Sequence, residues 1–226
     1  MATKDAEGWK VAVEKEYHRM KDMKVIKPKL YKDVPEGTTI LSNTWAMKKK
    51  ANGTLRARLV ARGFEQVDGE HYDEDDKAAP VVSDITIRVI MTLIVMATWF
   101  TQIVDVKGAF LLSDFEPQHK MYMEVPQGFE RIFEDSVKCL PKKAPKWVLE
   151  LLKTIYGTKQ AALQFWRFLV KILNGKGYNK SKADACLYYQ WTEQGLSVCI
   201  SWVDDCLLAG NKQDVLESKK KIMETL

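Results

Sequence analysis

A pair of adjacent aspartates, Asp204 and Asp205, lies between two apolar runs and is the feature that most constrains the fold. Residues 196–202 (LSVCISW) alternate apolar and small polar side chains with a period of two, and this pattern predicts a strand. Residues 206–211 (CLLAGN) form a second short apolar run that stops at a glycine and an asparagine. Two such runs joined by polar residues predict a β-hairpin with both carboxylates at or near its tip.

Two carboxylates this close repel each other, and a bound cation would remove the repulsion. Adjacent acids on a rigid hairpin can therefore form half of a magnesium site, although an ordinary Asp-rich turn is the alternative. A third acid, Asp105, directly follows the apolar residues Ile103 and Val104. If that strand lies beside the hairpin, three carboxylates meet at one end of a sheet. Phosphoryl transfer to a hydroxyl with two magnesium ions requires such an arrangement.

The strongest charge bias lies in residues 48–62 (KKKANGTLRARLVAR), which carry six cations and no acid. Asn52-Gly53 within this segment predicts a hairpin, and a basic hairpin would bind phosphate well. A solvated basic hairpin is the alternative. The next segment, residues 65–77, carries seven acids and His71. Its spacing matches no known pattern of metal ligands, so it is predicted to be a solvated surface loop.

The other segments alternate between helical and strand patterns. Helical spacing is found in residues 6–25, 82–100 and 159–177, and the second of these opens with Ser83 and Asp84 as candidate N-caps. Strands are predicted within residues 100–110, 120–129, 146–157 and 185–191, the first of them buried. Because hairpins dominate the second half, the pattern favours an α+β fold with an antiparallel sheet.

Composition excludes several classes of protein. The 226 residues are 46% apolar and 29% charged, as in globular proteins of one large or two small domains. The longest apolar stretch, residues 89–100, is too short to span a bilayer, and the first ten residues lack the apolar core of a signal peptide. The four cysteines have no CxxC spacing and are expected to be reduced thiols. We therefore expect neither secretion nor a membrane span.

An ordered series of motifs resembles the reverse transcriptase of copia-type LTR retrotransposons. Residues 104–129 (VDVKGAFLLSDFEPQHKMYMEVPQGF) resemble the family's DVKTAFLNG…VYMEQPEGF, and residues 201–210 (SWVDDCLLAG) resemble its YVDD signature. Residues 151–166 (LLKTIYGTKQAALQFW) resemble LYGLKQAPRAW. Residues 43–72, 79–97 and 181–189 resemble the fingers segment, the helix that follows it and a late palm strand. The resemblance covers roughly Trp9 to Gly210.

The resemblance implies an α+β fold with polymerase right-hand fingers and palm. It implies an antiparallel palm sheet with helices packed on one face, and no thumb within this chain. The expected domains are an N-terminal helical lead-in (1–40), fingers with the basic hairpin (41–101) and a palm truncated before the thumb and RNase H (102–226).

The resemblance also assigns roles to site residues. Asp105 and Asp204 would bridge two catalytic metal ions, and Asp205 would complete the acidic site. The carbonyl of Val106 would help to hold the metal that travels with the nucleotide. Phe110 would lie beneath the sugar of the incoming nucleotide and reject a 2′-hydroxyl.

Four further positions are expected to contact substrates. Lys49 and Arg58 are the choices for the triphosphate, although Lys48 or Arg56 could take either role because the register is uncertain. Gln160 matches a glutamine near the sugar and the template base. Trp202 stands next to the primer end, where most relatives have tyrosine. The departures from the family motifs remove no catalytic acid; they lie at Gly108, Leu112-Ser113 and Ala162-Leu163.

The activity implied is RNA-directed DNA polymerisation with two Mg²⁺ ions, for which Mn²⁺ could substitute. The partners implied are dNTPs, a primer and an RNA or DNA template. The thumb, RNase H and integrase regions of a parent polyprotein are expected, in a cytoplasmic virus-like particle or in the nucleus. A truncated, non-catalytic remnant that only binds nucleic acid is the alternative, and a magnesium-dependent nuclease or nucleotide-binding enzyme on the same palm fold is a third.

Overall fold

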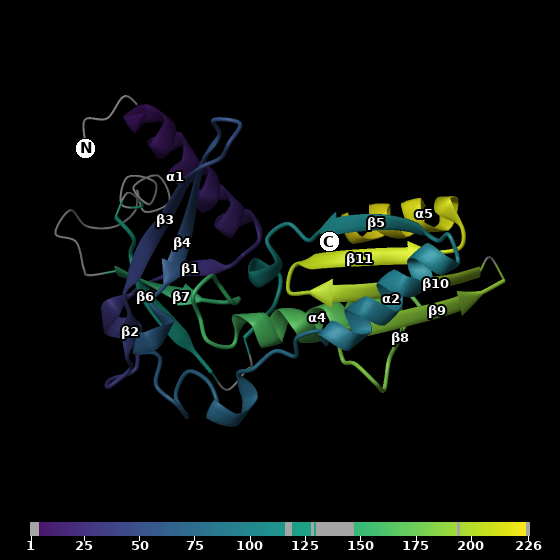
Figure 1. Cartoon of the computed structure of the whole chain (residues 1–226). Coiled ribbons are helices and arrows are strands. Elements are labelled where there is room, and N and C mark those ends of the chain that lie inside the picture. The colour runs from purple at the N-terminus through teal and green to yellow at the C-terminus, as the bar shows by residue number, and fades with distance from the viewer. Residues whose placement is uncertain (1–4, 116–118, 128, 130–146, 194, 225–226) are drawn as a thin grey trace. The chain divides into compact units, whose positions relative to one another are not determined.

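The structure is a computed structural model that describes residues 5–115, 119–127, 129, 147–193 and 195–224. The chain divides into two compact units that are both discontinuous in sequence. Unit 1 comprises residues 1–77 and 110–161, and unit 2 comprises residues 78–109 and 162–226. Figure 1 labels the elements of both units.

Unit 1 contains a four-stranded sheet and a separate two-stranded hairpin. The sheet has the order β1-β7-β6-β2, in which β2 alone runs parallel to its neighbour. Its strands are β1 (Ile26–Leu30), β2 (Ile40–Leu41), β6 (Met121–Glu124) and β7 (Trp147–Leu151). The hairpin consists of β3 (Asn43–Lys49) and β4 (Leu55–Ala61). Among the described residues of this unit, the helical elements are α1 (Ala6–Asp22), η1 (Tyr31–Asp33), η2 (Gly63–Glu65) and η3 (Glu74–Asp76), and η4 (Ala109–Leu111) begins with the last residue of a unit 2 segment and continues into unit 1.

The amphipathic helix predicted at the N-terminus is confirmed as α1, which packs against the hairpin. Tyr17 and Met20, one turn apart, enter a core that contains Leu59 of β4 and Phe129. The Phe129 ring meets Tyr17 edge to face at 4.9 Å and Trp45 at 5.5 Å between centroids. These aromatic contacts hold the hairpin and α1 together around one apolar cluster.

The basic hairpin predicted around Asn52-Gly53 is also confirmed. Its two strands pair without interruption from Asn43–Ala61 to Lys49–Leu55, and residues 50–54 form the loop. Gly53 has φ of 81°, which glycine adopts without steric cost.

Unit 2 is a five-stranded antiparallel sheet with three helices. The order is β5-β11-β10-β9-β8. The strands are β5 (Phe100–Asp105), β8 (Asn179–Lys180), β9 (Leu187–Thr192), β10 (Gly195–Trp202) and β11 (Asp205–Gly210). The helices are α2 (Asp84–Met96), α4 (Ala161–Gly175) and α5 (Gln213–Glu224). The mixed composition with antiparallel sheets agrees with the predicted α+β class.

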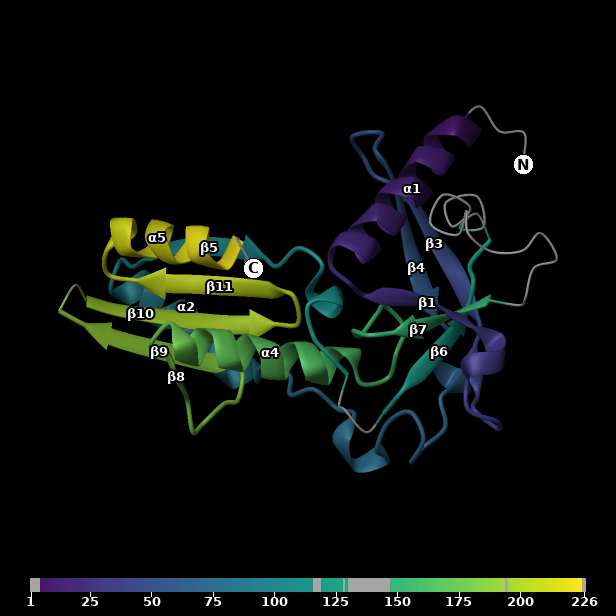
Figure 2. The ribbon, with the colours of Figure 1, turned by 180° about the vertical axis from the view of Figure 1, so that it is seen from behind.

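The two helices within the predicted palm, α4 and α5, lie on one face of this sheet, and α2, which falls within the predicted fingers, covers the other. α2 lies over the face that carries Val198 and Ile200, while α4 and α5 lie on the opposite face (Figures 1 and 2). Leu216 of α5 lies against Gly210 on that opposite face. β10 is buried on both sides. Val198 and Ile200 face α2, and Ser197 on the other side is buried and hydrogen-bonded to Tyr178 at 3.1 Å.

Two further expectations concern residues 82–110, the segment that contains α2 and β5. Ser83 caps α2, since its hydroxyl oxygen accepts a hydrogen bond from the Ile85 N–H at 3.3 Å. The strand predicted at residues 100–110 exists, but it is an edge strand rather than a buried one. Val104 is buried, whereas Ile103 is 70% exposed.

The compact units do not have the boundaries of the three predicted domains. α2 falls within the predicted fingers but belongs to unit 2, and β6 and β7 fall within the predicted palm but belong to unit 1. The functional assignment of residues 1–40, 41–101 and 102–226 remains a prediction. Over the described ranges, no helix is both long enough and apolar enough to cross a membrane.

Candidate functional site

The adjacent aspartates lie at the hairpin between β10 and β11, as predicted. Trp202 and Asp205 are direct partners that close the hairpin, and Val203 and Asp204 form its two-residue turn. Val203 has φ of 53°, as the first central residue of a primed hairpin turn requires. Positive φ in a β-branched residue is a true outlier that costs about 1–3 kcal/mol. The pairing of the strands therefore forces a strained turn that holds Asp204 at the tip.

β5 runs beside this hairpin, so the condition for a three-acid cluster is met. Asp105 is the direct partner of Asp205 in the antiparallel ladder, and the Val106 N–H donates to the Asp204 carbonyl at 3.0 Å. Directly opposite residues carry their side chains on the same face, with Cβ atoms about 4.5–5.5 Å apart. Asp105, Asp205 and Trp202 consequently share one face of the sheet, and the sequence order alone could not show this.

The three acids differ in their exposure. Asp105 and Asp205 are exposed, and Asp204 is half-buried. Among the described residues, no three His, Cys, Asp or Glu side chains already surround a common metal position. Carboxylate oxygens still fit the hard cation Mg²⁺, which proteins often hold through one or two carboxylates and the substrate's phosphates. The donor set on this face thus suits a metal that is completed by substrate.

Two residues beside the acids, Val106 and Trp202, were also predicted to contact a metal ion and the primer end, respectively. The Val106 carbonyl, expected to hold the nucleotide's metal, accepts a hydrogen bond from the Ala109 N–H at 3.3 Å, which occupies one of its two lone pairs. Trp202 is 53% exposed beside Asp205 and is available for stacking.

Two buried thiols lie on the face of the sheet opposite the acids. Cys199 and Cys206 are free, buried and neighbours across the hairpin. The hydrogen bond that the Cys199 thiol donates to Cys206, together with burial, raises the pKa of Cys199 well above its usual value. The thiol therefore stays protonated and adds no negative charge behind the carboxylates. The expectation of reduced thiols agrees with the three described cysteines, since Cys186, Cys199 and Cys206 are free, and Cys139 lies outside the described residues.

In unit 1, two of the predicted nucleotide-binding residues meet on a tyrosine. The Arg58 guanidinium carbon lies 4.8 Å from the centroid of the Tyr156 ring. The Phe110 ring meets the same ring edge to face, at 5.6 Å and 85°. Tyr156 was not identified from the sequence. The signal that could have found it is its place beside Gly157 in the LLKTIYGTKQ motif.

The register of the basic hairpin does not place Lys49 and Arg58 on one face. Arg58 pairs with Ala46 and Arg56 pairs with Lys48, so Lys48, Arg56 and Arg58 share a face. Lys49 points to the other face, where its ammonium pairs with Asp5 at 2.9 Å. Of the alternatives that the sequence left open, Lys48 and Arg56 are the ones grouped with Arg58.

Gln160 lies in the interior of unit 1 and is only 4% exposed. Its Oε1 accepts from Gln66 Nε2 at 2.9 Å, and its Nε2 donates to the His71 carbonyl at 2.8 Å. The amide therefore has a partner at both ends and lies in the interior, so a contact with a nucleotide would require the segment to open. His71 is buried as well, with Nδ1 accepting from the Val67 N–H at 2.9 Å.

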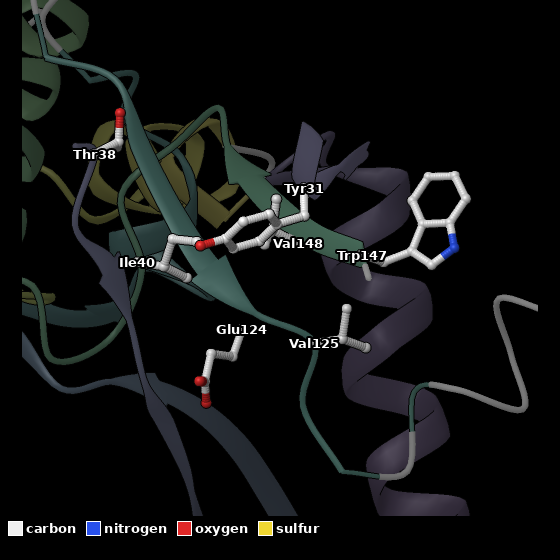
Figure 3. Close-up of a pocket in the computed structure, with 7 residues that line it drawn as sticks. All are labelled: Tyr31, Thr38, Ile40, Glu124, Val125, Trp147 and Val148. Carbon is white, nitrogen blue, oxygen red and sulfur yellow. The ribbon is translucent and has the colours of Figure 1, made fainter. Parts of the chain in front are cut away.

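A cavity of about 410 Å³ in unit 1 is unsuited to a triphosphate because its lining carries an acid and no cation. Figure 3 shows Glu124 as the single charged side chain among those that line it. None of the predicted site residues is part of it. The lining consists of Tyr31, Thr38, Ile40, Glu124, Val125, Trp147 and Val148.

Comparison with known proteins gives a consistent result. A family model described as reverse transcriptase (RNA-dependent DNA polymerase) matches residues 29–225. The Retrovirus-related Pol polyprotein from transposon TNT 1-94 of Nicotiana tabacum is 31% identical over 194 residues, which cover 83% of this chain and 14% of the relative. The corresponding polyprotein from transposon RE1 of Arabidopsis thaliana is 31% identical over 189 residues, covering 81% of this chain and 12% of the relative.

A more distant relative matches over nearly the whole chain. The Transposon Ty1-DR4 Gag-Pol polyprotein of Saccharomyces cerevisiae is 23% identical over 228 residues, covering 99% of this chain and 13% of the relative. The chain thus spans only about a seventh or an eighth of the length of the relatives it matches.

Proposed function

The chain belongs to the family of reverse transcriptases (RNA-dependent DNA polymerases) of copia-type retrotransposons, and from this premise we propose that it transfers nucleotidyl groups from dNTPs to a primer 3′-hydroxyl. The observation that carries the proposal is the ladder between β5 and β11, in which Asp105 faces Asp205 with Asp204 in the adjoining turn. We propose these three acids as the metal-binding and catalytic residues.

The acids supply negatively charged oxygens from two strands and one turn, and the Val106 carbonyl supplies a neutral one. Bound Mg²⁺, or Mn²⁺ in its place, would lower the pKa of the primer hydroxyl and neutralise charge on the leaving pyrophosphate. The protein's own part is to hold the carboxylates on one rigid sheet, so that little reorganisation is needed at the moment of reaction.

Arg58, Phe110, Trp202 and Gln160 are each proposed to contact a substrate. Arg58, with Lys48 or Arg56 from the same face, meets the triphosphate, because guanidinium groups bind phosphate oxygens in a bidentate way. Phe110 lies against the sugar and disfavours a 2′-hydroxyl. Trp202 stacks near the primer end. Gln160, which is buried, would contact the nucleotide only if its surroundings open.

Primer extension tests this proposal. The purified chain is given Mg²⁺, dNTPs and a primer annealed to an RNA or a DNA template. We expect extension by the wild type and a loss of at least about a hundredfold in Asp204→Asn, since one ligand charge leaves a two-metal site. Asp214→Asn is the matched control, because Asp214 is an exposed acid of unit 2 in the first turn of α5.

Each outcome separates the candidate functions. Binding of primer–template without extension by the wild type would favour the non-catalytic remnant. Cleavage of nucleic acid in the absence of dNTPs would favour the nuclease. Substantial extension by Asp204→Asn would remove Asp204 from the site. The relatives are polyproteins by name, and we propose that this chain likewise acts as one segment of a polyprotein.

A further inference from the structure

We propose that Tyr156 is a positioning residue for the incoming nucleotide, acting through both Arg58 and Phe110. The inference rests on the proposed function and deepens it. The Tyr156 ring sets the direction of the Arg58 guanidinium, which binds the triphosphate, and it supports the Phe110 ring, which selects the sugar.

The contact with Arg58 is a cation–π interaction. The guanidinium carbon lies 4.8 Å from the ring centroid, within the range of about 6 Å in which the ring quadrupole attracts a cation. Within the described part of the chain, Arg58 Nε is buried without a hydrogen-bond partner. The ring therefore fixes the direction of the guanidinium, and the triphosphate would meet its N–H groups other than the buried Nε.

The backbone makes Tyr156 a rigid support for Arg58. The Tyr156 carbonyl accepts a hydrogen bond from the Ala61 N–H at 2.9 Å. Gly157 follows with φ of 90° and approaches β4 so closely that a Cβ would overlap the Ala61 carbonyl oxygen. Ala61 stands three residues after Arg58 in the same strand, so the ring and the guanidinium are carried by directly bonded segments.

The contact with Phe110 is anchored in the same segment. The Phe110 and Tyr156 rings meet edge to face at 5.6 Å. The Phe110 carbonyl accepts from the Thr154 hydroxyl at 2.6 Å, two residues before Tyr156. A change at Tyr156 should therefore alter both dNTP affinity and sugar choice. A change at Arg58 or Phe110 should mainly alter one of the two.

The test measures nucleotide binding without chemistry. The full chain is mixed with Mg²⁺ and a primer–template whose primer ends in a dideoxynucleotide, and the Kd of the next complementary dNTP is measured. The same titration is then made with the matching rNTP. We expect Tyr156→Leu to weaken dNTP binding about tenfold and to narrow the preference for dNTP over rNTP. Tyr156→Phe keeps the ring and should stay within about twofold of the wild type in both readouts.

A double-mutant cycle separates positioning from folding. Arg58→Lys keeps the charge and leaves Tyr156 in place, but loses the planar group that stacks. The effects of Tyr156→Leu and Arg58→Lys on dNTP binding should be less than additive, because each removes the same oriented group. If Tyr156→Leu melts below the assay temperature, the cycle is made with Tyr156→Met, which keeps a large apolar side chain without a ring, and its loss combined with Arg58→Lys should again be less than additive.

Four results would overturn the inference, the last of them together with the proposed function. Unchanged dNTP affinity in folded Tyr156→Leu would show that the ring does not position the guanidinium. Additive losses in the cycle would show that Tyr156 does not act through Arg58. Tyr156→Phe as defective as Tyr156→Leu would show that the ring is not the cause. If the wild type itself binds no dNTP, the nucleotide site of the proposed function fails, and the inference fails with it.

Discussion

Asp105 and Asp205 face each other directly across the ladder between β5 and β11, although they are far apart in the sequence. Their carboxylates therefore lie on one face of the sheet, and their relative position is set by strand pairing rather than by a loop. The neighbouring bond from the Val106 N–H to the Asp204 carbonyl, 3.0 Å long, ties the turn to the same strand. Strain or slippage in β5 should thus affect the acids as a group.

The first prediction is that the metal-free protein becomes more stable when one of these acids is neutralised. Like charges directly opposite each other in a sheet are destabilising by about 0.2–1 kcal/mol. Asp205→Asn should gain that amount in free energy of unfolding, measured by urea denaturation without divalent ions. Added Mg²⁺ should raise the Tm of the wild type more than that of the variant. Equal Mg²⁺ effects in Asp205→Asn and the wild type would argue against a metal ligand at Asp205.

The second prediction distinguishes two adjacent lysines. Lys48 shares the face of Arg58, whereas Lys49 lies on the other face and pairs with Asp5. Lys48→Ala should raise the apparent KM for dNTP about tenfold, because a hydrogen bond to a charged group contributes about 1.5–3 kcal/mol. Lys49→Ala is the matched control and should leave the KM nearly unchanged. The reverse pattern in steady-state kinetics would restore Lys49 as the triphosphate contact.

The third prediction concerns sugar choice. A rigid ring beneath the sugar excludes a 2′-hydroxyl by overlap, and overlap in a packed site costs about 1–3 kcal/mol. Phe110→Ala should lower the preference for dNTP over rNTP by about tenfold, with a smaller loss in dNTP use. The measurement is competitive extension of one primer with both nucleotides. An unchanged ratio in an active variant would mean that Phe110 serves only to pack against Tyr156.

The fourth prediction compares two glycines with similar φ. Gly157 has φ of 90° and lies against the Ala61 backbone, whereas Gly37 has φ of 81° and open space around it. Gly37→Ala should cost only the strain of a left-handed residue, about 1–2 kcal/mol. Gly157→Ala adds backbone overlap and should cost clearly more, measured as the shift in the urea midpoint. Similar costs at both positions would mean that the approach of residue 157 to β4 is not tight in solution.

The fifth prediction is a pH dependence at Asp184. Burial alone would raise the pKa of this carboxyl, but hydrogen bonds from the Thr86 side chain and from the Ser83 and Cys186 N–H groups lower it below its usual value of 3.8. A lowered pKa stabilises the fold above the unfolded-state pKa, and that contribution is lost as the pH falls through the folded-state pKa.

Asp184→Asn should consequently destabilise the protein at pH 7 by about 1–3 kcal/mol, because an amide N–H now faces buried donors. The difference from the wild type should shrink as the pH falls below about 4. Urea denaturation at pH 7 and pH 3.5 checks this, with Asp214→Asn as the exposed control. A gap that stays constant with pH would show that the carboxylate charge is not what the hydrogen bonds stabilise.

Local chemistry in the sequence determined many elements of the fold. The period of two on either side of Asp204 and Asp205 predicted the hairpin, and the Asn52-Gly53 pair predicted the basic hairpin. Ser83 was one of two candidate caps, and it is the one whose side chain bonds the helix N-terminus. These features were predictable because turns, caps and short hairpins depend on residues only a few positions apart.

Only the tertiary structure decided which residues share a surface. The ladder that sets Asp105 opposite Asp205, the ring of Tyr156 between Arg58 and Phe110, and the burial of Gln160 all join segments distant in sequence. The separation of Lys48 from Lys49 shows why: a step of one residue along a strand moves a side chain to the opposite face. The register that fixes this step comes from pairing with another strand, and the pattern of either strand alone does not contain it.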